Sequence, residues 1–115
     1  MTLSELISCI EARVLVQPEN DPVIECGYTC DLLSWVMAHG APGMAWVTVQ
    51  THMNVIAVAS LMEMAAVIIP EDIEMEGPSL EKANDEGICV LQTGLTAYEI
   101  CARLAAAGLP GKSRD

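Results

Sequence analysis

Apolar residues along the chain cluster in short segments whose spacing predicts alternating strands and helices. Segments rich in β-branched and other apolar residues predict strands at residues 13–17, 23–29, 44–49, 65–69 and 88–91. Apolar residues at helical spacing predict helices over residues 3–10, 32–38, 53–64 and 79–86, and from residue 96 to the G-L-P sequence at 108–110. From residue 44 onward strands and helices alternate. Such alternation, with short and fully apolar strands, predicts an α/β fold: a mostly parallel β-sheet flanked by helices.

Polar residues at the expected boundaries predict where several helices begin. The sequences T-L-S-E (2–5) and T-A-Y-E (96–99) have the form of a capping box, in which the side chains of the first and last residues satisfy each other's backbone amides. Asp31 and Thr51 are the expected N-caps of the second and third helices.

The sequence G-K-S (111–113) resembles the last part of a phosphate-binding loop. The full pattern, G-x-x-x-x-G-K-[ST], needs a glycine where the chain has Ala106, and a helix after the loop. Only two residues follow Ser113. We therefore expect a single domain over residues 1–110 and a flexible tail at 111–115, with no phosphate-binding loop.

The third expected helix is apolar on nearly its whole circumference, through Val55, Ile56, Val58, Ala59 and Leu61. A helix of this kind is buried on more than one side. One side faces its own sheet, and we expect the other side to face a second copy of the chain. The composition supports self-association, because 52% hydrophobic residues in a chain of 115 leave more apolar surface than a small domain readily buries. We therefore predict a homodimer with these side chains in its interface.

The charge distribution argues against some classes of partner. A net charge of −11 leaves no basic surface to displace phosphate counterions, so we expect neither nucleic acid nor an anionic membrane as a partner. Residues 32–62 lack charged side chains, but glycine, proline and polar residues interrupt them, so they do not predict a membrane span. Seven acids lie between residues 71 and 86, against the single Lys82. We interpret them as a solvated loop and helix face, with an acidic docking surface as the alternative.

The five cysteines and the N-terminal sequence predict a cytoplasmic protein with reduced thiols. The number is odd, and residues 1–5 lack the basic start and apolar core of a secretory signal. Cys26 and Cys30 lie four residues apart, but zinc sites need paired C-x-x-C units or histidines at matching spacing. We expect the cysteines to be small buried apolar residues, with no metal and no cofactor. Catalysis by His52 or a cysteine would need a positioned partner, which the spacing does not predict.

Neutral polar residues follow the strand at 44–49 and mark a candidate ligand site, composed of Gln50, Thr51, His52 and Asn54. In parallel α/β sheets ligands bind beyond the carboxyl ends of the strands, where the amides of helix N-termini favour anions and polar groups. Gln92 and Thr93 end a later strand in the same way. If the two strands are neighbours, both Gln-Thr pairs line one rim of the sheet. The alternative is structural: these side chains cap a helix, satisfy loop amides or contact a twofold partner.

Several segments resemble the DRTGG domain family, in particular its small stand-alone bacterial members. The specific ones are D-L-L-S-W-V-M (31–37) and W-V-T-V-Q-T-H-M-N (46–54), and the likeness extends from Leu3 to Leu109. The D-R-T-G-G sequence itself is absent, and E-C-G-Y-T-C-D (25–31) stands near its place. The resemblance implies a compact α/β domain similar to the N-terminal domain of HPr kinase/phosphorylase, with a regulatory or assembly role. It does not imply a serine kinase, because that activity belongs to a separate domain with a phosphate-binding loop.

The function that we expect from these features is that of a non-catalytic, homo-oligomeric regulatory or assembly module. It would bind a small polar or nucleotide-like ligand at the rim around residues 50–54. The alternative is a structural adaptor that docks on a partner protein through the apolar helix or through the acidic face at 71–86.

Overall fold

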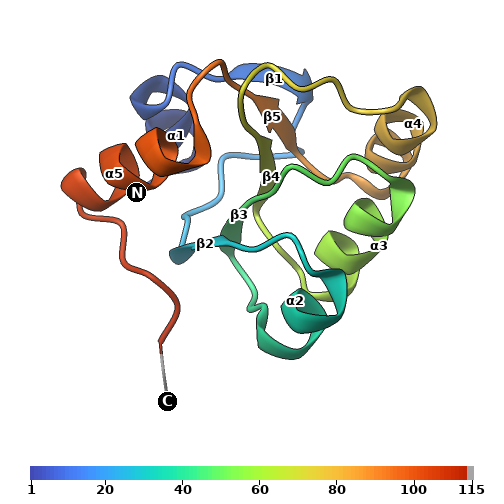
Figure 1. Ribbon diagram of the computed structural model, residues 1–115, viewed down its shortest axis with the longest axis horizontal. Coiled ribbons are helices and arrows are strands. Elements are labelled where there is room, and N and C mark those ends of the chain that lie inside the picture. The colour runs from blue at the N-terminus through green and yellow to red at the C-terminus, as the bar shows by residue number, and fades with distance from the viewer. Residues whose placement is uncertain (114–115) are drawn as a thin grey trace.

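One five-stranded sheet lies between two layers of helices in the computed structural model, which describes residues 1–113 (Figure 1). The strands are β1 (Arg13–Val16), β2 (Cys26–Thr29), β3 (Met44–Val47), β4 (Ala66–Ile69) and β5 (Val90–Gln92). The helices are α1 (Leu3–Cys9), α2 (Leu33–His39), α3 (Met53–Leu61), α4 (Gly77–Glu86) and α5 (Ala97–Ala106). The predicted α/β fold is confirmed.

The strands follow the order β1-β5-β4-β3-β2 across the sheet. β2, β3, β4 and β5 run parallel, and β1 pairs antiparallel with β5. The sheet is therefore mostly parallel, as predicted, with β1 at one edge and β2 at the other. The carboxyl ends of the four parallel strands lie along the same side of the sheet, where ligands commonly bind in such folds.

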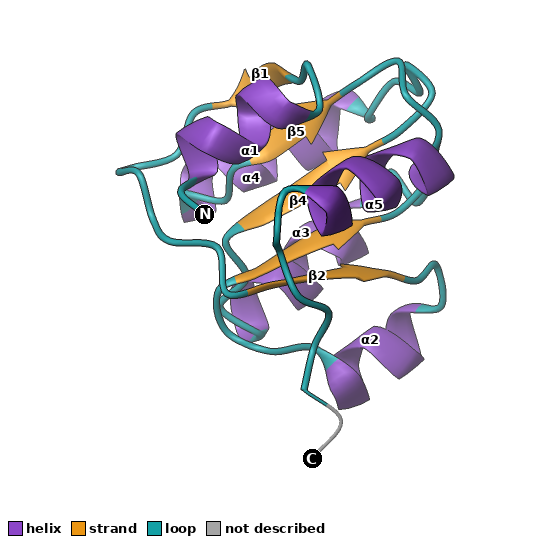
Figure 2. Cartoon of the chain, turned by 90° about the vertical axis from the view of Figure 1, so that its left-hand side faces the viewer, coloured by secondary structure: helices purple, strands orange, loops and turns teal. Residues whose placement is uncertain are grey.

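Different helices cover the two faces of the sheet. α2, α3 and α4 lie on one face, and α1 and α5 lie on the other (Figures 1 and 2). Successive side chains of a strand point to opposite faces. In β3, Met44 and Trp46 accordingly pack in the core of the first layer, while Ala45 and Val47 pack in the core of the second. Both faces of the sheet are thus buried, which is why its strands read as continuous apolar runs.

The position of α3 corrects the interface predicted for it. α3 packs between α2 and α4 as well as against the sheet, so a single chain already covers more than one of its sides. Four of the five side chains expected at the dimer interface are buried within the chain: Val55, Ile56, Val58 and Ala59. Only the fifth, Leu61, is exposed, at 66%. The four buried side chains therefore leave no surface for a second copy, and the dimer itself stays a prediction.

The predicted capping box is formed at α1, only its Thr96 half is formed at α5, and the caps of α2 and α3 differ from the prediction. Thr2 and Glu5 form a capping box, and the hydroxyl of Thr96 accepts a hydrogen bond from the amide of Glu99 (3.1 Å). α2 begins after Leu32 without a side-chain cap. At α3 the N-cap is His52, one residue after the expected one. Its ring nitrogen Nδ1 accepts a hydrogen bond from the amide of Asn54 (3.2 Å).

The segment after α5 returns to the outer edge of β2. The amide of Gly27 donates a hydrogen bond to the carbonyl of Pro110 (2.9 Å), and Gly27 forms an isolated parallel bridge with Gly111. The first residue of the predicted flexible tail is therefore paired with the sheet, and residues 114–115 of that tail lie outside the described part of the chain. Within residues 1–113, no helix is long and apolar enough to cross a membrane.

Candidate functional site

The loop after β3 carries the predicted rim residues. Hydrogen bonds within the chain hold the first of them, Gln50. The side-chain amide of Gln50 donates to the carbonyl of Asp31 (3.0 Å), and its backbone amide donates to the hydroxyl of Thr48 (3.2 Å). The carboxylate of Asp31 in turn accepts from the Thr48 hydroxyl and from the amide of Val49, both at 2.9 Å. Asp31 therefore joins the ends of β2 and β3. The prediction that it caps α2 is wrong, because α2 begins after Leu32 without a side-chain cap.

Thr51 and His52 also form hydrogen bonds within the chain, whereas the side chain of Asn54 forms none among residues 1–113. The carbonyl of Thr51 accepts from the hydroxyl of Ser79 (2.6 Å), and its hydroxyl lies 3.5 Å from the carboxylate of Glu76. These contacts tie the start of α3 to α4, while His52 takes the capping role predicted for Thr51. The side chain of Asn54 is exposed and makes no hydrogen bond within residues 1–113. Three of the four rim side chains therefore have structural partners, and a ligand at this rim remains a prediction.

Gln92 and Thr93 are not directly beside residues 50–54, because β4 lies between β3 and β5 and the two strands are not neighbours. Both residues are buried. The amide group of Gln92 donates to the carbonyl of Ile73 (2.8 Å) and accepts from the guanidinium of Arg13 (2.8 Å). The hydroxyl of Thr93 donates to the carbonyl of Ile10 (2.8 Å). Their polar atoms hold the loops around β5, and the condition for the two Gln-Thr pairs to adjoin, neighbouring strands, is not met.

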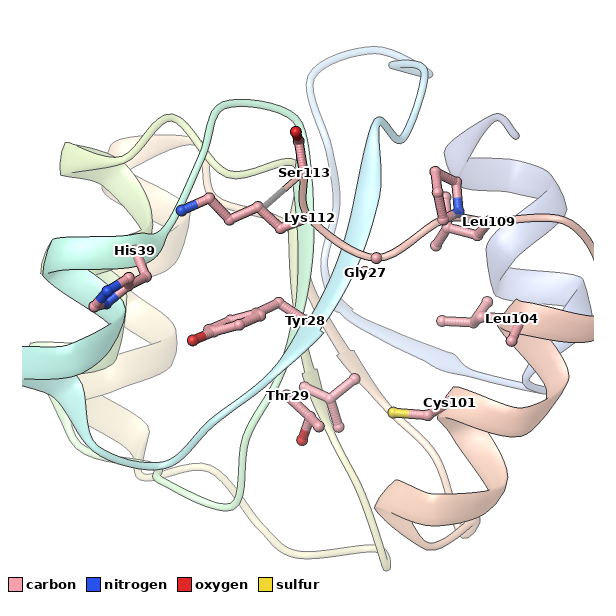
Figure 3. A pocket seen from close by; sticks show the side chains of 13 residues that line it. Gly27, Tyr28, Thr29, His39, Cys101, Leu104, Leu109, Lys112 and Ser113 are labelled. Carbon is pink, nitrogen blue, oxygen red and sulfur yellow. The ribbon is translucent and has the colours of Figure 1, made fainter. Parts of the chain in front are cut away.

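A cavity of about 650 Å³ lies elsewhere, at the outer edge of β2. Its walls come from β2, from α5 and from the segment between residues 109 and 113, with His39 of α2 at one end. Figure 3 shows Cys101 and Leu104 of α5 on one side of β2 and His39 on the other. Tyr28 and Lys112 point toward the α2 side (Figure 3). The cavity therefore spans the edge of the sheet, with an apolar wall at α5 and polar groups near α2.

The local charge at this cavity is opposite to that of the whole chain. Among residues 1–113, Lys112 is the one lysine or arginine side chain without an ion pair. The other cations form the pairs Arg13–Asp72 (2.6 Å), Lys82–Glu86 (3.1 Å) and Arg103–Glu11 (2.9 Å). An unpaired ammonium group beside an apolar wall is a favourable position for an anion.

Two further side chains define the chemistry of the cavity. The Nδ1 atom of His39 donates to the carbonyl of Trp35 (2.9 Å), and the two rings stack with their centroids 4.1 Å apart. The ring of His39 is therefore held in place, and its Nε2 atom is the one left for a ligand. Burial raises the pKa of the Cys101 thiol. Cys101 is thus a neutral, apolar part of the wall at physiological pH, and a poor nucleophile.

The thiols of the described chain are unpaired, and most of those with a shifted pKa are protected by burial. The five cysteines are free, and burial raises the pKa of Cys26 and Cys89 as well as that of Cys101. Within residues 1–113, no group of three or more His, Cys, Asp or Glu side chains could hold a metal ion.

Sequence reasoning missed the cavity residues because they come from distant segments. Tyr28, His39, Cys101 and Lys112 share no motif or spacing. Their meeting depends on β2 being an edge strand and on the C-terminal segment turning back to it. The one available signal was G-L-P-G-K (108–112), a helix stop followed by a lysine. Residues 111–115 of this region are predicted from the sequence to be a flexible tail.

Comparison with known proteins supports the fold. No protein-family model matches the chain, and no curated protein matches it. Among solved structures, it is similar to the CBS and DRTGG domains of the regulatory region of Clostridium perfringens pyrophosphatase, complexed with the activator diadenosine tetraphosphate. The TM-score is 0.72 at 13% identity, and the likeness covers 95% of this chain and 47% of that one. The chain thus spans about half the length of that regulatory region and has a DRTGG-like fold, whereas membership of the family remains a resemblance.

Proposed function

We propose that this chain is a non-catalytic regulatory module that binds a nucleotide-like small molecule. The observation that carries the proposal is its likeness, over 95% of its length, to a regulatory region that was crystallised with a nucleotide activator. The neighbour is a regulatory region and not a catalytic one, which supports a binding role for this chain. Free thiols without disulfide bonds support a cytoplasmic location.

The cavity at the β2 edge supports the ligand-binding part of this proposal. Its volume of about 650 Å³ falls within the roughly 300–1,000 Å³ that is typical of small-molecule sites. An apolar wall with a few polar groups is also typical of such sites. The neutral Cys101 thiol makes a covalent reaction with a ligand unfavourable.

The proposal is tested by thermal unfolding with a panel of AMP, ADP, ATP and diadenosine tetraphosphate. A ligand at about a hundred times its Kd stabilises the folded state by about 2.7 kcal/mol, which raises the unfolding midpoint by several degrees. Phosphorus NMR of the same samples over hours checks that the compound is not consumed. If millimolar concentrations of all four compounds leave the midpoint unchanged, the nucleotide-binding role is wrong.

A second candidate, docking on a partner protein, has support from the acidic segment. All seven acids between residues 71 and 86 are exposed. Only two of them form ion pairs within the described chain, Asp72 with Arg13 and Glu86 with Lys82. A variant with Glu74, Glu81 and Asp85 changed to lysine would lose a partner that co-purifies with the wild-type chain. Retention of that partner would contradict docking through this face.

We also propose that the chain forms a homodimer, with α2 and not α3 supplying the contact. Large apolar side chains are exposed on this short helix and just before it: Leu32, Trp35 and Met37. Exposed apolar side chains of this size, gathered on one element, favour association with another surface.

A further inference from the structure

Three polar side chains around the β2-edge cavity have no partner within the described chain. Neither the hydroxyl groups of Tyr28 and Thr29 nor the ammonium group of Lys112 forms a hydrogen bond or ion pair among residues 1–113. Most polar atoms of the rim residues after β3, in contrast, form hydrogen bonds with neighbouring loop and helix residues. More of the side chains available to a ligand therefore lie at the cavity than at the predicted rim, where Asn54 is the one without a hydrogen bond among residues 1–113.

The positions of these groups divide the cavity into a polar part and an apolar part. Lys112 and Tyr28 point to the α2 side of the strand, where the Nε2 atom of His39 also lies (Figure 3). Cys101 and Leu104 form the wall on the α5 side. A ligand that fills both parts must carry an anionic group at one end and an apolar or planar group at the other.

A phosphate or carboxylate matches the polar part. Lys112 supplies a full positive charge, and hydrogen bonds between ionised partners are about twice as strong as neutral ones. The hydroxyl of Tyr28 points to the same side of the strand as Lys112 and can donate a hydrogen bond to the same anion (Figure 3). The cavity volume of about 650 Å³ suits a ligand with one ring system and one anionic group.

We propose that the cavity at the β2 edge is the nucleotide site, and that it holds a nucleoside monophosphate. Lys112 and the hydroxyl of Tyr28 bind the phosphate on the α2 side of the strand, and the α5 wall of Cys101 and Leu104 packs against the base. This inference rests on the proposed function and adds to it the location of the site and the size of the ligand. Residues 109–113 form one wall, so the site depends on the pairing of Gly111 with β2.

Calorimetric titration of the full chain with AMP and with adenosine tests this assignment. Lys112→Gln removes the charge, and we expect it to weaken AMP binding about tenfold while leaving adenosine binding unchanged. Tyr28→Phe removes the hydroxyl, and we expect it to weaken AMP binding a few-fold while leaving adenosine binding unchanged. The matched control is Lys82→Gln on α4, which removes a lysine that is already paired with Glu86 (3.1 Å) and should bind AMP like the wild type.

The outcomes separate the location of the site from the proposed function. If AMP binds the wild type and both cavity variants equally, the site is elsewhere, and a Gln50→Ala/Asn54→Ala variant then tests the rim. If no nucleotide binds the wild type, the proposed function fails and this inference fails with it. Amide NMR of the wild type with AMP provides a readout that does not depend on the folding of a variant. Shifts must centre on Tyr28, Cys101 and Lys112, and shifts confined to residues 50–54 would contradict the site.

Discussion

Burial controls the protonation of the Cys89 thiol. Cys89 packs between the sheet and the layer of α1 and α5, and burial raises its pKa from 9.0 to about 12. The folded state therefore holds the proton more tightly than the unfolded state. Its stabilising contribution is complete below pH 9 and is lost as the pH rises toward 12, with a limiting slope of about 1.4 kcal/mol per pH unit.

The comparison that checks this uses wild type and Cys89→Ala in urea unfolding between pH 8 and 11. We expect the free energy of unfolding to fall more steeply with pH in the wild type, so that the difference between the two proteins shrinks. Parallel curves would show that Cys89 does not titrate with a raised pKa. The folded wild type should also leave this thiol unmodified by iodoacetamide at pH 8, as shown by mass spectrometry.

Asp31 joins two loops at the carboxyl ends of β2 and β3. Asp31→Ala removes both hydrogen bonds to its carboxylate and leaves the hydroxyl of Thr48 without its acceptor. Thr48 is buried, so we expect a loss of about 1–3 kcal/mol in the free energy of unfolding, measured in urea. Asp85→Ala is the control, because Asp85 is exposed on α4, and it should change stability by less than about 0.5 kcal/mol. Equal effects of the two variants would contradict the role assigned to Asp31.

At the scale of elements, α3 shows what periodicity can and cannot predict. The apolar pattern of residues 53–64 correctly indicated a helix buried on more than one side, because periodicity reports which positions avoid water. It could not report what covers them. Two helices of the same chain, α2 and α4, occupy the place that the sequence had assigned to a partner subunit.

Two substitutions in α3 test this internal burial. Ile56→Ala removes buried atoms and should lower the free energy of unfolding by about 2–5 kcal/mol. Leu61→Ala changes an exposed side chain of the same helix and should stay within about 0.5 kcal/mol of the wild type. Urea unfolding at two protein concentrations checks both values. If Leu61→Ala were the more damaging change, or if the loss caused by Ile56→Ala disappeared in dilute protein, α3 would contact a second copy.

The order of the strands is the second property that the sequence left open at this scale. The residues themselves predicted five strands, with all but one bound within two residues of the observed one, because β-branched runs identify strands locally. The order of the strands depends on how each helical connection between two strands packs on the sheet. A local sequence pattern does not predict that order. The sequence places Gln50 and Gln92 side by side only if their strands are neighbours, and β4 separates those strands. The cavity was missed for the same reason, since it needs β2 at an edge and the C-terminal segment beside it.

For the whole molecule, the open question is which surface a second copy would cover. The charge of −11 is spread over exposed acids, whereas α2 carries no charged residue in its sequence L-S-W-V-M-A-H. Association through α2 would therefore avoid much of the repulsion between two acidic chains. Trp35 is 52% exposed and is the largest apolar side chain on this helix, and aromatic residues commonly supply much of the binding energy at interfaces.

We expect the wild type to be a dimer in light scattering at tens of micromolar, and Trp35→Glu to be a monomer under the same conditions. The glutamate places a charge among the exposed apolar side chains of α2, where it would lose its water on association without gaining a partner. Tyr98→Glu is the control, because Tyr98 is an aromatic residue that is 85% exposed on α5, on the other face of the sheet. A monomeric wild type would contradict the dimer. A Tyr98→Glu variant that dissociates while Trp35→Glu stays dimeric would move the interface from α2 to α5.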